Sequence, residues 1–258
     1  MASGLDSARL TVSLLDADRD LAAGVPADDL EAARRRALAA VVEVGPPEWD
    51  PSAVCAMAEP GWLGLFVIDG LMIRRVTVGK RAACELFGPG DLLRPWDADG
   101  EYEPLPINID WIVLKTVRLA VLDAAFVMRT APWPSINSGI VSRVVQRARY
   151  LCLTEAVMHL PRAHPRLLIL FLLLAERWGK VGPDGVRISL PLTHEVLGTL
   201  IGAQRPTVTI ALQRLARAGL LTRERTDRWL LTNAAIERLR NPERLALIDA
   251  DDDGEELA

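Results

Sequence analysis

Residues 190–232, LPLTHEVLGTLIGAQRPTVTIALQRLARAGLLTRERTDRWLLT, decide the fold of the C-terminal part of this chain. Thr193 is a typical cap at the start of a helix, and Gly202 tolerates the positive φ that a sharp turn after that helix needs. Pro206 suits the first turn of a second helix, where its missing N–H costs little. A hairpin rich in arginine follows the second helix. The stretch predicts a winged helix-turn-helix.

The outer side of the second helix and the hairpin carry the chemistry of a DNA reader. Arginine can donate two hydrogen bonds to guanine and glutamine can bond bidentately to adenine, and residues near the start of a recognition helix reach bases first. We therefore expect Arg205 to read a base, Gln204 and Thr207 to contact phosphates, and Ile210 to meet a thymine methyl group. The candidate DNA contacts are Gln204, Arg205, Pro206, Thr207, Thr209, Ile210, Gln213, Arg214 and, as phosphate contacts of the wing, Arg223, Arg225 and Arg228.

The charge of the chain is unevenly distributed. The net charge of -4 is unusual for a DNA-binding protein, but residues 162–244 hold 14 Lys and Arg against 7 Asp and Glu. Residues 245–258 contain six acids and no base. A locally basic domain is what phosphate neutralisation requires. We interpret the acidic end as a disordered tail.

The N-terminal part is rich in short apolar runs separated by glycine turns, which predicts a small barrel or a β-roll. Asp69-Gly70 between two such runs favours a hairpin. A helix is expected to begin near Asp28 or Asp29, a helical turn at 123–128, and an acidic loop at 97–106. The expected strands are residues 54–57, 62–68, 71–78, 82–87, 111–114 and 118–122.

A long helix without proline is expected at residues 135–160, between the prolines at 132–134 and Pro161. Small and β-branched side chains recur on it at helical spacing, which favours pairing with a second copy across a two-fold axis. The alternative is a helix that packs on the core of its own domain. The candidate dimer contacts are Val141, Val144, Val145, Ala148, Leu151, Cys152 and Glu155. A strongly apolar helix at 166–178 follows.

Several classes of protein are excluded by motifs that the sequence lacks. Three widely spaced cysteines argue against a disulfide framework and indicate a reducing cytoplasm. No apolar run reaches the ~20 residues of a membrane span, and no export signal is recognisable. We expect no enzyme, because the chain has no nucleophile elbow, phosphate-binding loop or acid/base pair. We also expect no cofactor and no metal, since His159, His164 and Cys152 are too loosely spaced for a ligand set.

Residues 190–232 resemble the DNA-binding domain of the Crp/Fnr family of bacterial transcription regulators. The resemblance covers roughly residues 50–240, with Gly88-Pro89-Gly90-Asp91 at a turn of the family's effector roll. It implies an α+β protein with an N-terminal helix and β-roll effector-like domain (1–134), a dimerisation helix (135–161), a winged helix-turn-helix (162–244) and the acidic tail (245–258). It also implies a homodimer on a near-palindromic double-stranded DNA site, with RNA polymerase as a candidate partner and the effector unknown.

The sequence departs from the family members that bind cyclic AMP. Their phosphate cassette places an arginine beside a serine or threonine, because a partly buried phosphate needs a positive charge. Gly100-Glu101 is present here, but residues 102–108 offer no arginine; Arg94 and Arg118 are the nearest substitutes. Cyclic-nucleotide control is therefore not expected. Two alternatives stay open: a sensor whose roll binds an uncharged or hydrophobic ligand near Trp62, Trp96 and Trp111, and an architectural DNA-binding protein without strong sequence preference.

Overall fold

The chain forms two units, residues 1–148 and 149–258, in a computed structural model that describes residues 10–98 and 106–240. The acidic tail at 245–258 and Gly100-Glu101 lie outside the described residues, as does most of the predicted acidic loop. The long helix α5 (Pro134–Met158) begins in the N-terminal unit and ends in the C-terminal unit. No helix among the described residues has both the length and the apolar character that crossing a membrane requires.

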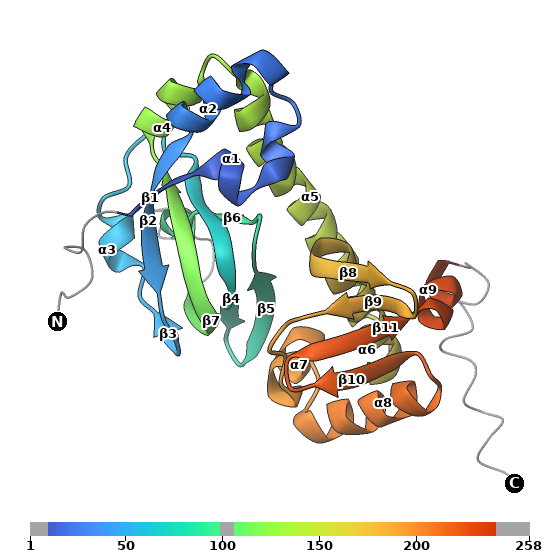
Figure 1. The fold of residues 1–258 in the computed structure, drawn as a ribbon. Coiled ribbons are helices and arrows are strands. Elements are labelled where there is room, and N and C mark those ends of the chain that lie inside the picture. The colour runs from blue at the N-terminus through green and yellow to red at the C-terminus, as the bar shows by residue number, and fades with distance from the viewer. Residues whose placement is uncertain (1–9, 99–105, 241–258) are drawn as a thin grey trace, which may run out of the picture. The chain divides into compact units, whose positions relative to one another are not determined.

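The N-terminal unit is a β-roll with small helices (Figure 1). Seven strands, all paired antiparallel, run in the order β1-β2-β7-β4-β5, with β3 paired to β7 and β6 to β4. The elements are β1 (Thr11–Ser13), α1 (Leu14–Ala17), η1 (Arg19–Ala22), η2 (Ala27–Asp29), α2 (Leu30–Arg36), β2 (Leu38–Val44), β3 (Glu48–Trp49), α3 (Ser52–Cys55), β4 (Gly64–Val78), β5 (Arg81–Phe87), β6 (Leu92–Leu93), η3 (Pro95–Ala98), β7 (Ile107–Leu122) and α4 (Ala124–Thr130).

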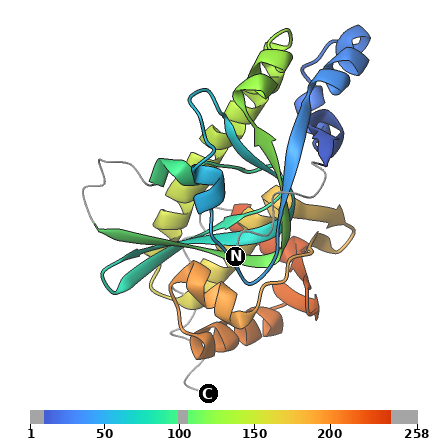
Figure 2. The ribbon, with the colours of Figure 1, turned by 90° about the vertical axis from the view of Figure 1, so that its left-hand side faces the viewer.

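Two apolar clusters fill this unit. One lies inside the roll and contains Phe87, Trp111 and Leu119; the other packs α1, α2 and α4 against the start of α5 through Leu14, Phe126 and other residues. In both ribbon views these helices gather at one end of the sheet (Figures 1 and 2). The roll and α5 therefore share a continuous N-terminal unit.

The predicted hairpin at Asp69-Gly70 is wrong. β4 continues through both residues as one strand, and its pairing with β7 shifts register between Val67 and Met72. Gly70 has φ +100°, and a Cβ there would lie 2.3 Å from the carbonyl oxygen of Thr116. The glycine is needed for a bulge and a close approach, not for a reversal. Because β7 is also a long strand, with 16 residues, it pairs with β4 on both sides of the bulge.

Gly70→Ala is expected to destabilise the chain by about 3 kcal/mol or more, because positive φ and overlap with the backbone of β7 both oppose a Cβ. Gly79→Ala is the matched control. Gly79 also has a positive φ, +59°, but a Cβ there would meet nothing within 4 Å, so only the conformational cost of about 1 kcal/mol applies. Urea unfolding of the full chain gives both values. Equal losses for the two variants would contradict the close approach.

Two other expectations about secondary structure are wrong. Residues 54–57 are not a strand: α3 begins after Pro51, and the Asp50 carboxylate accepts hydrogen bonds from the backbone and hydroxyl of Ser52. Residues 111–114 and 118–122 belong to the single strand β7. The helix that begins near Asp29, as predicted, ends at Arg36, and the alanines and valines after it form β2. Pairing with β7 outweighs their helix propensity.

The C-terminal unit is a helix-turn-helix backed by a sheet of order β10-β11-β9-β8. Its elements after α5 are α6 (Ala163–Trp178), β8 (Gly179–Gly182), β9 (Gly185–Ile188), α7 (His194–Ile201), α8 (Arg205–Arg217), β10 (Leu221–Arg225), β11 (Arg228–Thr232) and α9 (Asn233–Arg240). Phe171 of the apolar helix α6 packs on Trp229 of β11, with ring centroids 4.9 Å apart. This core holds the sheet and the helix pair together.

Candidate nucleic-acid interface and dimer helix

Local signals build the helix-turn-helix as the sequence predicts. The Thr193 hydroxyl accepts a hydrogen bond from the backbone of Val196 at 3.1 Å and caps α7. Gly202 ends α7 in the left-handed conformation, with φ 64°. A Cβ on Gly198 would lie 2.5 Å from the carbonyl oxygen of Ala203, so glycine permits the close turn. Pro206 occupies the first turn of α8. The start of α8 is thereby fixed against α7.

The buried side of α8 consists of Val208, Ala211, Leu212 and Leu215. The opposite side leaves most of the candidate DNA contacts exposed, including Ile210 at 68%. The exposed candidates are Gln204, Arg205, Pro206, Thr207, Ile210, Gln213, Arg223 and Arg225, and the half-buried ones are Thr209, Arg214 and Arg228. Their accessibility is compatible with a groove-reading helix, and their roles in DNA binding stay a prediction.

Thr209 makes two contacts within the protein. Its hydroxyl donates to the backbone carbonyl of Arg205 at 3.0 Å and lies 2.9 Å from Nδ1 of His194. The pKa of His194 is lowered, first by burial and then by the positive charges of Arg223 and Arg205. His194 was not among the candidates from sequence. Its place directly after the cap of the first helix was the signal that could have found it.

The wing is the hairpin of β10 and β11. Arg223 donates to the carbonyl of Thr226 at 2.6 Å and lies over the ring of Trp229, which orients its guanidinium. Glu224, the acid between the wing arginines, is paired with Arg187 of β9 at 3.2 Å. Arg187 thus offsets a charge that would repel a DNA backbone. Arg225 of β10 and Arg228 of β11 are opposite each other in the backbone ladder of the hairpin, after a register shift between Arg223 and Arg225.

Helix α5 has two different faces. Ile136 and Ile140 are buried, and Arg143 and Arg147 point to the same side and bind the N-terminal unit. The candidate dimer residues lie on another side, and all of them are exposed: Val141, Val144, Val145, Ala148, Leu151, Cys152 and Glu155. Four of these apolar side chains are 44–60% exposed. Apolar side chains exposed together on one side of a helix are compatible with a surface that binds a partner, and the dimer contacts stay a prediction.

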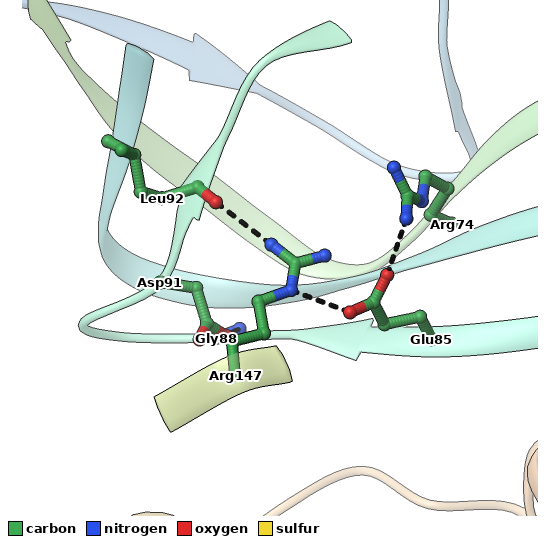
Figure 3. Close-up of polar contacts among 6 residues, drawn as sticks. All are labelled: Arg74, Glu85, Gly88, Asp91, Leu92 and Arg147. Atoms are coloured by element: carbon green, nitrogen blue, oxygen red, sulfur yellow. Dashed lines mark hydrogen bonds and ion pairs between the residues drawn. The ribbon is translucent and has the colours of Figure 1, made fainter. Parts of the chain in front are cut away.

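Arg147 connects α5 to the β-roll through three contacts (Figure 3). Its guanidinium binds the Glu85 carboxylate at 2.6 Å, donates to the Leu92 carbonyl at 2.8 Å and lies 3.6 Å from the centre of the Phe87 ring. The other carboxylate oxygen of Glu85 binds Arg74 at 2.8 Å. The pair is almost buried, with 14% of the Arg147 side chain and 12% of the Glu85 side chain exposed. Sequence reasoning missed this network.

A second arginine on the same face of α5 repeats the attachment. Arg143 pairs with Asp18 at 2.6 Å and lies over the ring of Phe66. Close by, the carboxylate of Asp91 accepts from the backbone of Gly88 at 2.8 Å and closes the turn between β5 and β6 (Figure 3). Arg143 and Arg147 thus fix the helix to the roll at two points one turn apart.

The tryptophans considered for a ligand site are packed against protein. Trp111 is 5% exposed and contacts the rings of Phe87 and Trp49. Trp62 lies edge-on to Trp96, on which Arg94 stacks while pairing with Asp97. No group of three or more potential metal ligands gathers within residues 10–98 and 106–240. Cys152 is exposed, whereas Cys55 and Cys84 are half-buried.

Comparison with known proteins gives a consistent result. The Crp-like helix-turn-helix domain matches residues 166–241. Regulatory protein CysR of Synechococcus elongatus is 30% identical over 70% of this chain and 82% of its own length. A CRP-like cAMP-activated global transcriptional regulator of Mycobacterium tuberculosis is 27% identical over 75% of this chain and 82% of its own.

Solved structures share the fold. FixK2 from Bradyrhizobium japonicum aligns over 82% of this chain and 97% of its own, with a TM-score of 0.54 and 17% identity. A cyclic nucleotide-binding domain containing protein from Listeria monocytogenes aligns over 75% of this chain and 90% of its own, with a TM-score of 0.58 and 14% identity. At these identities the likeness shows the β-roll and helix-turn-helix architecture alone.

Proposed function

This chain belongs to the Crp/Fnr family of DNA-binding transcription regulators, and from that premise we propose that it acts as a homodimer on a near-palindromic DNA site without a cyclic nucleotide. The exposed apolar stripe on α5 carries the proposal, because two such stripes bury each other when two helices pair. Pairing across a two-fold axis presents two α8 helices to successive major grooves, about 34 Å apart. The protein acts in the cytoplasm, has no catalytic role, and meets RNA polymerase at its promoters.

Selection of bound duplexes from random DNA tests this function. The full chain is expected to enrich two inverted half-sites separated by about one helical turn. The selected duplex is then titrated at several salt concentrations beside a scrambled duplex, because a regulator keeps a gap in affinity that an architectural protein lacks. Enrichment of a single half-site would count against the dimer, and equal affinity for both duplexes would count against sequence-specific regulation.

Cys152 offers a direct test of the α5 pairing. When two parallel helices pair, identical residues on the seam lie opposite each other. In a chain with Cys55→Ala and Cys84→Ala, mild oxidation is expected to link Cys152 to its copy and give a covalent dimer on a non-reducing gel. The control replaces Cys152 by serine and adds Gln146→Cys, an exposed position outside the stripe. Equal cross-linking of the two chains would contradict the pairing.

Independence from cyclic AMP is supported by the contacts between α5 and the roll. The M. tuberculosis relative is named for activation by cyclic AMP, but residues 102–108 of this chain contain no arginine that could meet the phosphate. Arg94, one substitute considered from sequence, is already paired with Asp97 and donates to the Trp62 carbonyl at 3.1 Å. Arg147 and Arg143 already attach α5 to the roll through acids of the chain itself. Adding cyclic AMP to the selection is expected to leave the enriched DNA sequences unchanged, and calorimetry is expected to detect no binding of cyclic AMP to the protein. Tighter binding of DNA in the presence of cyclic AMP would contradict this independence.

A further inference from the structure

We propose that His194 binds a DNA phosphate in its protonated form, so that each protomer takes up about one proton when the regulator binds DNA. This inference rests on the proposed docking of α8 and the wing. It adds a DNA contact that the helix-turn-helix pattern does not reveal, and it makes DNA affinity depend on pH.

The position of His194 comes from three elements. The ring sits on α7, its Nδ1 lies 2.9 Å from the Thr209 hydroxyl of α8, and the charges of Arg205 on α8 and Arg223 on β10 act on it. Glu195, the next residue on α7, is exposed. Arg205 is the expected base reader and Arg223 an expected phosphate contact. DNA that presents a base to Arg205 and a phosphate to Arg223 therefore passes close to His194.

The hydrogen bonds of the Thr209 hydroxyl indicate which ring nitrogen of His194 carries the proton in the free protein. A hydroxyl has one hydrogen, and Thr209 donates it to the Arg205 carbonyl at 3.0 Å. The contact between Thr209 and Nδ1 is then assigned as a bond that the imidazole donates, and the pH series below tests this tautomer. In the neutral ring this leaves Nε2 as an acceptor, and within the described residues Nε2 has no partner.

A phosphate oxygen can only accept hydrogen bonds at neutral pH. It repels the lone pair of Nε2 in the neutral ring but accepts a strong, charge-assisted bond once Nε2 is protonated. In the free protein, burial and the two arginines lower the pKa of His194, so the ring is neutral near pH 7. A phosphate that neutralises Arg223 and another that contacts Nε2 both raise this pKa. Proton uptake on binding follows.

The sign of the pH dependence follows from this linkage. Below the pKa of the free protein, His194 is charged in both states and the affinity is constant. Between the pKa of the free protein and that of the complex, the affinity falls by up to about tenfold per pH unit and per protomer as the pH rises. The contribution is lost above the pKa of the complex. Acidification therefore tightens DNA binding.

The test uses the full chain and a fluorescent duplex of about three helical turns with arbitrary sequence, since a phosphate contact needs no base sequence. Affinities are measured from about pH 5.5 to about pH 8.5 at constant ionic strength. Calorimetry in two buffers of different ionisation enthalpy counts the protons taken up. The variants are His194→Gln, whose amide can donate without titrating, and His159→Gln as the control for a second, exposed histidine.

We expect the wild type and His159→Gln to bind more tightly at low pH and to take up protons, and His194→Gln to bind with little pH dependence and no uptake. An unchanged pH dependence in His194→Gln would overturn the proposal. Binding by the wild type without pH dependence would overturn it too, because Thr209 would then donate to Nδ1 and a neutral Nε2–H would suffice; the DNA-binding function would stand. If the wild type binds no duplex at all, the proposed function falls together with this inference.

Discussion

Replacing Arg205 by alanine is expected to remove about 1–3 kcal/mol of base discrimination per half-site, because one bidentate contact to guanine is worth that much. A homodimer makes the contact twice. The difference in binding free energy between the selected and the scrambled duplex is therefore expected to fall by twice this amount. Arg205 is exposed at the first position of α8. The start of that helix is held by Gly202 and by the close turn at Gly198. The variant is therefore expected to fold normally.

Titration of the selected and the scrambled duplex with wild type and Arg205→Ala gives this number. Arg225→Ala is the matched control, since this exposed wing arginine is expected to meet phosphate. Arg225→Ala is expected to weaken binding to both duplexes by the same factor and to reduce the slope of log affinity against log salt concentration by about 1. An Arg205→Ala protein that keeps the wild-type preference would remove Arg205 from base reading and leave the other exposed residues of α8 as candidates.

Removing Glu85 is expected to destabilise the N-terminal unit strongly. Glu85→Leu leaves the nearly buried guanidinium of Arg147 without its carboxylate, and breaking a buried ion pair on one side costs about 3–5 kcal/mol. Glu85→Leu combined with Arg147→Leu is expected to recover part of that loss, because an apolar pair needs no charge compensation. Arg74 loses the same partner, but its side chain is 32% exposed and can be solvated.

Urea unfolding of wild type, both single variants and the double variant forms a closed cycle that measures the coupling. Additive losses would mean that Arg147 and Glu85 do not stabilise each other. Lys115→Ala provides the comparison with a surface pair. Lys115 and Asp69 are 58% and 53% exposed and lie 3.1 Å apart, so this change is expected to cost less than about 1 kcal/mol.

The winged helix-turn-helix was predictable because its signals are local. The cap at Thr193, the left-handed turn at Gly202 and the proline at the start of α8 act within a few residues of their own position. Side-chain spacing likewise predicted α5 and the exposed stripe on it. Each of these features depends on local backbone preference or on helical periodicity, and both can be read from the sequence.

Expectations for the roll were less accurate because strand pairing is not local. Asp69-Gly70 has the composition of a hairpin turn, yet β7, some 45 residues later, pairs with both sides of it. The turn signal is weaker than a ladder of hydrogen bonds to a long partner strand. The alanines and valines of β2 were similarly placed by their partner β7 rather than by propensity.

The sequence by itself determined the DNA-reading module and the periodicity of α5, since short-range backbone preferences and helical spacing suffice for both. Only the tertiary structure determined which residues far apart in the sequence contact each other. Arg147 meets Glu85, 62 residues before it, and His194 meets Thr209 across the turn between two helices. The sequence does not distinguish a charged residue that is exposed to water from one that pairs with a buried carboxylate. Its environment exists only after the chain has folded, so the pairing of Arg147 with Glu85 and the contact of His194 with Thr209 could not be predicted from residue types.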